Sequence, residues 1–348
     1  MSVVQGVADH SSNTERIVSV VLPVFNASAY IGAAIHSILD QTFAAFELIV
    51  VDDGSSDGSP EIIERIASSD RRIVTLTREH AGLVAALQKG VAVSRGRYIA
   101  RMDADDISLP RRLEAQVELL DANPAVDVAS CRVEFCSAVP FGTGTERYAR
   151  WVNSLVSPED IARDIFVESP IPHPSVMMRA EALERAGGYQ DHGWPEDYDL
   201  WLRMHLSGSR FAKVPETLLR WSVRDDSLCR TDERYSIEKF RECKLHYLSR
   251  SHLKDRYEVL VWGAGRVGKP WVRTLKQAGF DVPCIVDVDP RKTGKTIHGA
   301  KVISPDEVPS AGTYVLLVAV GAPGARELIR EDLGRKGYRE TADFVCVA

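Results

Sequence analysis

The chain has 348 residues, of which 45% are hydrophobic and 26% charged, and its formal net charge is −6 at pH 7. This length exceeds one ordinary domain, and the composition is that of a globular protein. The negative charge, with no basic run to offset it, argues against a nucleic-acid partner, and no apolar stretch approaches the length of a membrane span.

Residues 1–14 are polar and lack the apolar segment of a signal peptide, so a flexible tail is expected there. The apolar run Ile17–Leu22 predicts a buried strand, and Ser28 is placed to cap the helix that follows. That helix is indicated by apolar residues at helical spacing: Ile31, Ile35, Ile38 and Leu39.

A second buried strand is expected at Leu48–Val51, after which Ser59 and Pro60 begin a helix as N-cap and first helical residue. Ile73–Leu76 predicts a third strand and Leu83–Val93 a further helix. This alternation is typical of a Rossmann-like α/β fold, in which a mainly parallel sheet carries helices on both faces.

A short strand at Arg97–Arg101 leads into two acids, Asp103 and Asp105, whose side chains leave an extended backbone on the same side. Two like charges held that close favour a hard divalent cation with oxygen ligands. A solvated acidic turn is the alternative. Ligands of parallel sheets bind at the carboxyl ends of strands, so the loops at 23–26, 52–53 and 103–105 are expected to meet in one crevice.

Four segments then resemble, in the same order, the signatures of family 2 glycosyltransferases with the GT-A fold. They are Val18–Asn26, Val51–Gly58, Met102–Asp106 and Trp194–Arg203, and the likeness covers about Val18–Ser236. One departure is the run from Arg78 to Gly82, where the family more usually has Asn-x-Gly.

The resemblance implies a role for each matching residue in binding the nucleotide-sugar donor. Asp52 would accept a hydrogen bond from a uracil-like base beside Pro23 and Phe25, although an Asx-turn would equally explain Asp52 and Asp53. Asp105 would bind Mg²⁺ or Mn²⁺ directly, with Asp103 on metal or ribose. The remaining donor contacts would be Val24, Asn26, Asp53, Arg78, Gly82 and Ala104.

The resemblance also implies a single displacement with inversion, in which Asp197 takes the proton of the acceptor hydroxyl. Glu196 and His173 would lie on the acceptor side. The alternative is that Glu196 and Asp197 only complement the dipole of a helix that begins near Pro195. Asp199 and Arg203, four residues apart, are predicted to form an ordinary surface pair.

A second unit is expected after a polar linker at 249–256. A strand at 257–262, the glycines Gly263, Gly265 and Gly268, and Asp287 after another strand match the dinucleotide-binding fingerprint. The region is similar to the nucleotide-binding N-terminal domain of bacterial sugar acetyltransferases. The sequence does not decide whether this unit binds a ligand or has a purely structural role.

The sequence thus predicts a GT-A domain at 15–250 and a small Rossmann-like domain at 251–348. The expected function is inverting, metal-dependent transfer from a UDP-sugar to a saccharide or glycolipid in cell-surface polysaccharide synthesis. Alternatives are an NAD-dependent sugar oxidoreductase or a non-catalytic sugar-nucleotide scaffold. Six cysteines without Cys-x-x-Cys spacing favour reduced thiols in a cytoplasmic protein, with peripheral membrane contact open.

Overall fold

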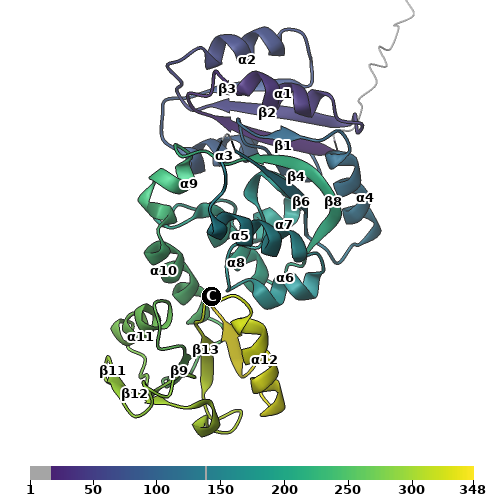
Figure 1. The fold of residues 1–348 in the computed structure, drawn as a ribbon. Coiled ribbons are helices and arrows are strands. Elements are labelled where there is room, and N and C mark those ends of the chain that lie inside the picture. The colour runs from purple at the N-terminus through teal and green to yellow at the C-terminus, as the bar shows by residue number, and fades with distance from the viewer. Residues whose placement is uncertain (1–16, 138) are drawn as a thin grey trace, which may run out of the picture.

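The computed structural model describes residues 17–137 and 139–348, which build two sheets (Figure 1). The larger sheet has eight strands in the order β3-β2-β1-β4-β7-β6-β8-β5, and the smaller has six in the order β11-β12-β10-β9-β13-β14. The tail expected at residues 1–14 lies outside the described residues.

The first half of the large sheet is parallel and follows the predicted elements closely. Its strands are β1 (Val18–Val24), β2 (Phe46–Asp52), β3 (Ile73–Thr77) and β4 (Tyr98–Arg101), and its helices are α1 (Ile31–Leu39), α2 (Ser59–Ala67) and α3 (Leu83–Val93). Alternate residues of β1 serve opposite faces: Val20 and Leu22 pack with α1, while Val21 packs with Leu87 of α3. This confirms a sheet with helices on both faces.

Pairing register brings the ends of these strands to one edge. Val24 lies beside Asp52 in the β1–β2 pair, and Val21 lies beside Arg101 in the β1–β4 pair. The loops that follow β1, β2 and β4 therefore emerge side by side.

The second half makes the sheet mixed, because β7 runs antiparallel to both β4 and β6. Its strands are β5 (Ile107–Ser108), β6 (Val128–Cys136), β7 (Met177–Arg179) and β8 (Phe211–Ser222). Its helices are α4 (Arg112–Ala122), α5 (Thr143–Ser154), α6 (Pro158–Asp164), η1 (His173–Ser175), α7 (Ala180–Arg185), α8 (Glu196–Leu206), α9 (Leu228–Thr231), η2 (Glu233–Tyr235) and α10 (Ile237–Leu248).

Two predicted helix caps are wrong. The N-cap of α1 is Tyr30, and Ser28 instead donates its N–H to the Asp57 carboxylate at 2.9 Å. Ser59 is the first residue of α2 rather than its cap, and its Oγ accepts the N–H of Ala27 at 2.9 Å. These polar residues join the loop after β1 to the loop after β2, and tertiary contacts of this kind outweigh local capping preference.

The small sheet has helices α11 (Gly268–Gln277) and α12 (Ala325–Arg335). Its strands, with the short helix η3, are β9 (Val259–Trp262), β10 (Cys284–Val286), β11 (Thr296–Ile297), β12 (Ala300–Ile303), η3 (Pro305–Glu307), β13 (Val315–Val318) and β14 (Phe344–Cys346). The expected strand at 257–262 begins two residues late. We keep the domain boundary at 250–251 as a prediction.

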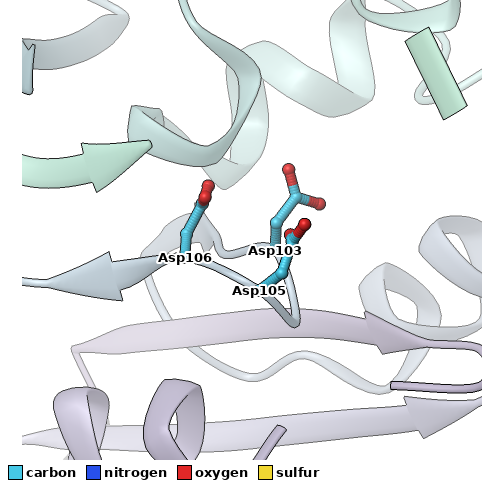
Figure 2. A group of neighbouring side chains, drawn as sticks. All are labelled: Asp103, Asp105 and Asp106. Atoms are coloured by element: carbon cyan, nitrogen blue, oxygen red, sulfur yellow. The ribbon is translucent and has the colours of Figure 1, made fainter. Parts of the chain in front are cut away.

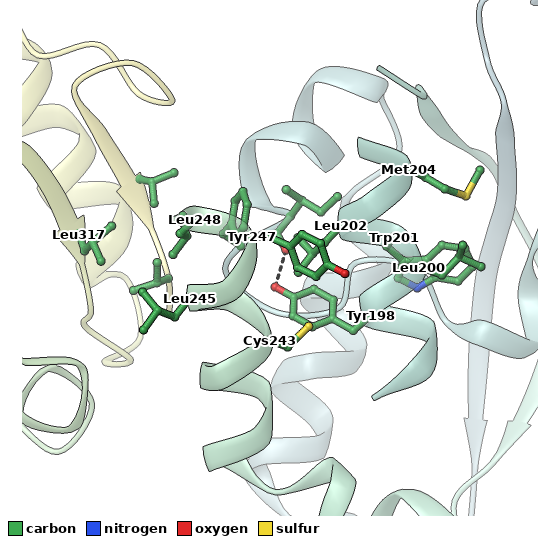
Figure 3. Packing of buried hydrophobic residues seen from close by; sticks show 14 of the residues in the cluster. Tyr198, Leu200, Trp201, Leu202, Met204, Cys243, Leu245, Tyr247, Leu248 and Leu317 are labelled. Atoms are coloured by element: carbon green, nitrogen blue, oxygen red, sulfur yellow. Dashed lines mark hydrogen bonds between the residues drawn. The ribbon is translucent and has the colours of Figure 1, made fainter. Parts of the chain in front are cut away.

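Apolar packing joins the two sheets through α10. Figure 3 shows Leu245 and Leu248 of this helix next to Leu317 of β13, and all three belong to one buried cluster. Lys244 of α10 is buried, and its ammonium donates to the carbonyls of Val167 at 2.7 Å and Val347 at 3.1 Å. A single core therefore runs across the connection between the sheets.

A second, polar connection lies between α6 and α12. The buried carboxylate of Asp164 pairs with Arg330, which also binds Glu340 at 2.8 Å. In the part of the chain that the structure describes, no helix is both long and apolar enough to cross a bilayer. All six cysteines lie in that part and are free.

Candidate active site

Three carboxylates gather where β4 ends. One oxygen each from Asp103, Asp105 and Asp106 lies within 4.8 Å of the others, and Figure 2 shows the three side chains projecting to the same side of the turn. The N–H of Met102, bound to the Val21 carbonyl at 3.1 Å, fixes where the strand gives way to this turn. The structure therefore places Asp103 and Asp105 close together, as the sequence predicted.

Sequence reasoning missed Asp106, because strand periodicity places neighbouring side chains on opposite sides. The turn at residues 104–105 breaks that alternation. Asp106 is fully buried, and its Oδ1 accepts the N–H of Ser222 at 2.7 Å. Its other oxygen, Oδ2, is buried without a hydrogen-bond partner. The sequence did offer a signal for Asp106, because it is the third acid in the run that begins at Asp103.

Burial and mutual repulsion make the ionised state of this cluster costly. The pKa of Asp105 is raised to about 6, first by burial and then by the charge of Asp103. The pKa of Asp106 is raised well above its usual range for the same reasons. Two guanidinium groups partly offset the charge: buried Arg101 pairs with Asp103, and Arg224 lies 3.2 Å from Asp105. Three carboxylates in mutual repulsion, with one buried Asp106 oxygen lacking a hydrogen-bond partner, fit a divalent cation.

The loops after β1 and β2 hold each other through polar side chains. Oδ1 of Asn26 accepts the N–H of Ser56 at 2.8 Å, and Asn26 adopts a left-handed conformation with φ 48°. Buried Asp52 accepts the N–H of Ser55 at 3.1 Å, which is the local turn that the sequence left as an alternative.

Asp53 organises the loop that departs from the family pattern. Its carboxylate accepts the N–H of Gly82 at 2.8 Å and lies 2.8 Å from His80 and 3.3 Å from Arg78. Gly82 has φ 89°, a conformation open to glycine, and precedes α3. Arg78 and Gly82 are thus both placed by Asp53.

The exposed surface of this region is an aromatic pair. Phe25 is 47% exposed, and its ring stacks on His80 with centroids 4.0 Å apart. Pro23 and Val24 are buried within β1, so the surface expected beside the nucleotide base is formed by the rings of Phe25 and His80. We call these two residues the Phe25–His80 wall. His80 was missed, because nothing local in the sequence links it to Phe25.

The acids that begin α8 have unequal surroundings. Glu196 is buried, accepts the hydroxyl of Tyr235 at 2.7 Å and lies 3.5 Å from Nδ1 of His173. The opposite nitrogen of His173 bonds the Tyr189 hydroxyl at 2.8 Å, so this histidine is buried behind Glu196. Burial, and then Arg101, lower the pKa of His173.

Asp197 is partly exposed and accepts the N–H of Tyr198 at 2.7 Å. Partial burial, which desolvates the carboxylate, and then the charge of Glu196 raise the pKa of Asp197 to about 8. A carboxylate that holds its proton near neutral pH has the acid–base character that proton transfer requires.

Asp199 and Arg203 form the predicted pair, but the expectation that it lies on the surface is wrong. Asp199 is fully buried, and besides Arg203 at 2.7 Å it accepts from Trp194 at 2.9 Å and from the Tyr247 hydroxyl. The reason is tertiary: α10 packs against α8 and covers the face that the sequence alone leaves to solvent.

The glycine-rich loop of the small sheet is tightly packed against itself. A Cβ on Gly268 would lie 1.7 Å from the Gly263 carbonyl oxygen, so glycine is required there. Asp287 binds the N–H of Ala264 at 2.8 Å and Lys292 at 3.0 Å. The carboxylate expected to face a ribose is thus engaged by the loop itself.

Comparison with known proteins agrees with this geometry. Residues 19–187 match the family model described as Glycosyl transferase family 2, and residues 255–341 match the one described as C2185-like, N-terminal. EpsE of Bacillus subtilis is 33% identical over 231 residues, covering 65% of this chain and 80% of EpsE. The amylovoran biosynthesis glycosyltransferase AmsE of Erwinia amylovora is 32% identical over 188 residues, covering 53% of this chain and 68% of AmsE.

Among solved structures, the fold is similar to that of S. aureus TarS 1–349 in complex with UDP-GlcNAc. The TM-score is 0.56 at 19% sequence identity, and the match covers 69% of this chain and 68% of TarS 1–349. At that identity the likeness establishes a mixed α/β GT-A fold.

Proposed function

Because the chain belongs to glycosyl transferase family 2, we propose that it moves a sugar from a UDP-sugar to a hydroxyl of a saccharide or glycolipid, with inversion. The observation that carries the proposal is the carboxylate cluster Asp103–Asp106 at the strand edge shared with the Phe25–His80 wall. AmsE, named for amylovoran biosynthesis, supports a cell-surface polysaccharide as the product, and UDP-GlcNAc in the TarS complex supports the donor class.

Asp103 and Asp105, with the unpartnered oxygen of Asp106, would hold Mg²⁺ or Mn²⁺. When bound, the ion supplies a Lewis acid that neutralises the departing diphosphate. Arg101 pairs with Asp103, and Arg224, beside Asp105, would add a second positive charge for the diphosphate.

The donor base is proposed to lie against Phe25 and His80, with Asp52 accepting from its ring N–H. Asp53 positions this wall through its contacts to the loop at 78–82. Asn26 and Ala104 complete the proposed donor contacts.

Asp197 is the proposed base. Its raised pKa, about 8, suits a group that accepts the acceptor proton late, as the attacking oxygen becomes acidic. Inversion by a single displacement is proposed because the resemblance to family 2 glycosyltransferases implies it. Glu196 and His173 are proposed to set the position of Asp197 from behind.

We propose that residues 15–250 form the transferase domain and that residues 251–348 are structural. The engagement of Asp287 by Ala264 and Lys292 supports a structural role over an NAD-dependent oxidoreductase. We further propose a cytoplasmic enzyme that can work beside a membrane surface.

The test is hydrolysis and transfer from a panel of UDP-, GDP- and dTDP-sugars, with Mn²⁺ or with EDTA. We expect turnover of a UDP-sugar that EDTA abolishes and that Asp105→Ala removes. Turnover by Asp105→Ala that is indifferent to chelator would overturn the proposal. Binding of NAD(H) to the full chain, measured in parallel, would instead support the oxidoreductase.

A further inference from the structure

Four aromatic rings meet beside the acid cluster without being fully buried. Phe135 and Trp221 are the last residues but one of β6 and β8, Phe141 lies in the loop before α5, and Tyr148 lies within α5. The Phe135 centroid lies 5.0 Å from Trp221, 6.1 Å from Tyr148 and 6.3 Å from Phe141. We call these four residues the aromatic shelf.

One end of the shelf is tied to the proposed metal ligands. Trp221 precedes Ser222, whose N–H binds Asp106 at 2.7 Å and whose hydroxyl binds the Asp105 carbonyl. These bonds fix the end of β8 relative to the acid cluster, and Trp221 is one residue away from that end.

The other end is tied to the loop that precedes His173. The Tyr148 hydroxyl donates to the Ser169 carbonyl at 3.0 Å, in the loop that leads to His173. Ser169 lies four residues before His173, and Nδ1 of His173 is 3.5 Å from Glu196, the residue next to Asp197 in the chain. Contacts at its two ends thus link the shelf to the acid cluster and to the segment that leads to His173.

Strand order separates the shelf from the donor base. The Phe25–His80 wall belongs to the β1–β3 side of the sheet, and β6 and β8 lie on the opposite side of β4. An acceptor has to approach the sugar from the side away from the nucleotide, and the shelf is on that side.

We propose that the aromatic shelf binds the sugar ring of the acceptor, chiefly through Trp221 and Phe135. This rests on the function proposed above. Aromatic faces carry partial negative charge, and the C–H face of a pyranose carries partial positive charge, so the two stack. Ligand sites typically combine such rings with a few polar groups, here Asp197 and the acid cluster.

Direct binding tests the shelf without requiring transfer. The full chain labelled with 5-fluorotryptophan is titrated, in UDP and Mn²⁺, with the methyl β-glycosides of glucose, galactose and N-acetylglucosamine. The Trp221 ¹⁹F resonance is assigned by its loss in Trp221→Phe. We expect at least one glycoside to shift it in a saturable manner; no shift up to the solubility limit would overturn the inference.

Variants then separate this inference from the proposed function. With the glycoside that shifts Trp221 as acceptor, Trp221→Leu and Phe135→Leu should each raise the acceptor KM about tenfold and leave donor hydrolysis unchanged. The matched control is Tyr257→Leu, an aromatic residue 70% exposed on the small domain, which should change neither. Wild-type protein that turns over no nucleotide sugar contradicts the proposed function.

An unchanged acceptor KM in both leucine variants contradicts the shelf alone. Equal losses of donor hydrolysis and transfer in Trp221→Leu would also contradict it, because they would mean that the ring acts through Ser222 on the acid cluster. Trp221→Phe, which keeps a smaller ring, should retain a lower acceptor KM than Trp221→Leu.

Discussion

Replacing Asp105 by Asn should make the metal-free protein more stable. Folding raises the pKa of this carboxyl from 3.8 to about 6, so its ionised form is disfavoured in the folded state. A shift of that size corresponds to about 3 kcal/mol of folding free energy. The penalty is absent below pH 3.8, grows as the pH rises through the two values, and is complete above pH 6. The gain from Asp105→Asn should therefore be largest near pH 7.5.

The assay is thermal unfolding of both proteins in EDTA at pH 5 and pH 7.5, repeated with Mn²⁺. We expect the variant to unfold at a higher temperature than wild type in EDTA at pH 7.5, and Mn²⁺ to stabilise wild type only. Asp103→Asn is the matched control, because it removes the partner of buried Arg101 and should destabilise. If Asp105→Asn unfolds earlier than wild type in EDTA at pH 7.5, the electrostatic reasoning fails.

Three further predictions concern the acids and the wall. Transfer should rise with pH up to about 8 as Asp197 ionises, and Asp197→Asn should bind donor but not transfer it; a flat pH–rate profile would reject Asp197 as base. Asp199→Ala should cost about 3–5 kcal/mol in urea unfolding, since Arg203 loses its buried partner; a cost under about 1 kcal/mol would contradict this network. His80→Ala should weaken UDP binding about tenfold by calorimetry, through loss of ring stacking, and unchanged affinity would exclude the wall.

Local pattern and strand-end logic predicted much of the transferase half. The helix at Leu83–Val93 begins and ends as predicted, and Asp103 and Asp105 lie together at the end of β4. These features follow from periodicity and from the geometry of parallel sheets, both of which the sequence carries locally.

Long-range contacts account for what the sequence could not predict. Asp199 is buried because α10, more than thirty residues later, packs on α8. Ser28 does not cap its helix because Asp57 takes its N–H. His80 and Phe25 meet across fifty-four intervening residues, and Asp106 joins the cluster only because a turn reverses the strand alternation.

The buried ammonium of Lys244 constrains how this protein can move. Burial lowers the pKa of Lys244, and its ammonium donates to the carbonyls of Val167 and Val347, which belong to opposite sides of the junction. Hinge bending between the two units would pull one carbonyl away and strand a poorly solvated charge. We therefore expect that any closure over a bound substrate comes from rearrangement of short loops, and that the two units keep their positions relative to each other.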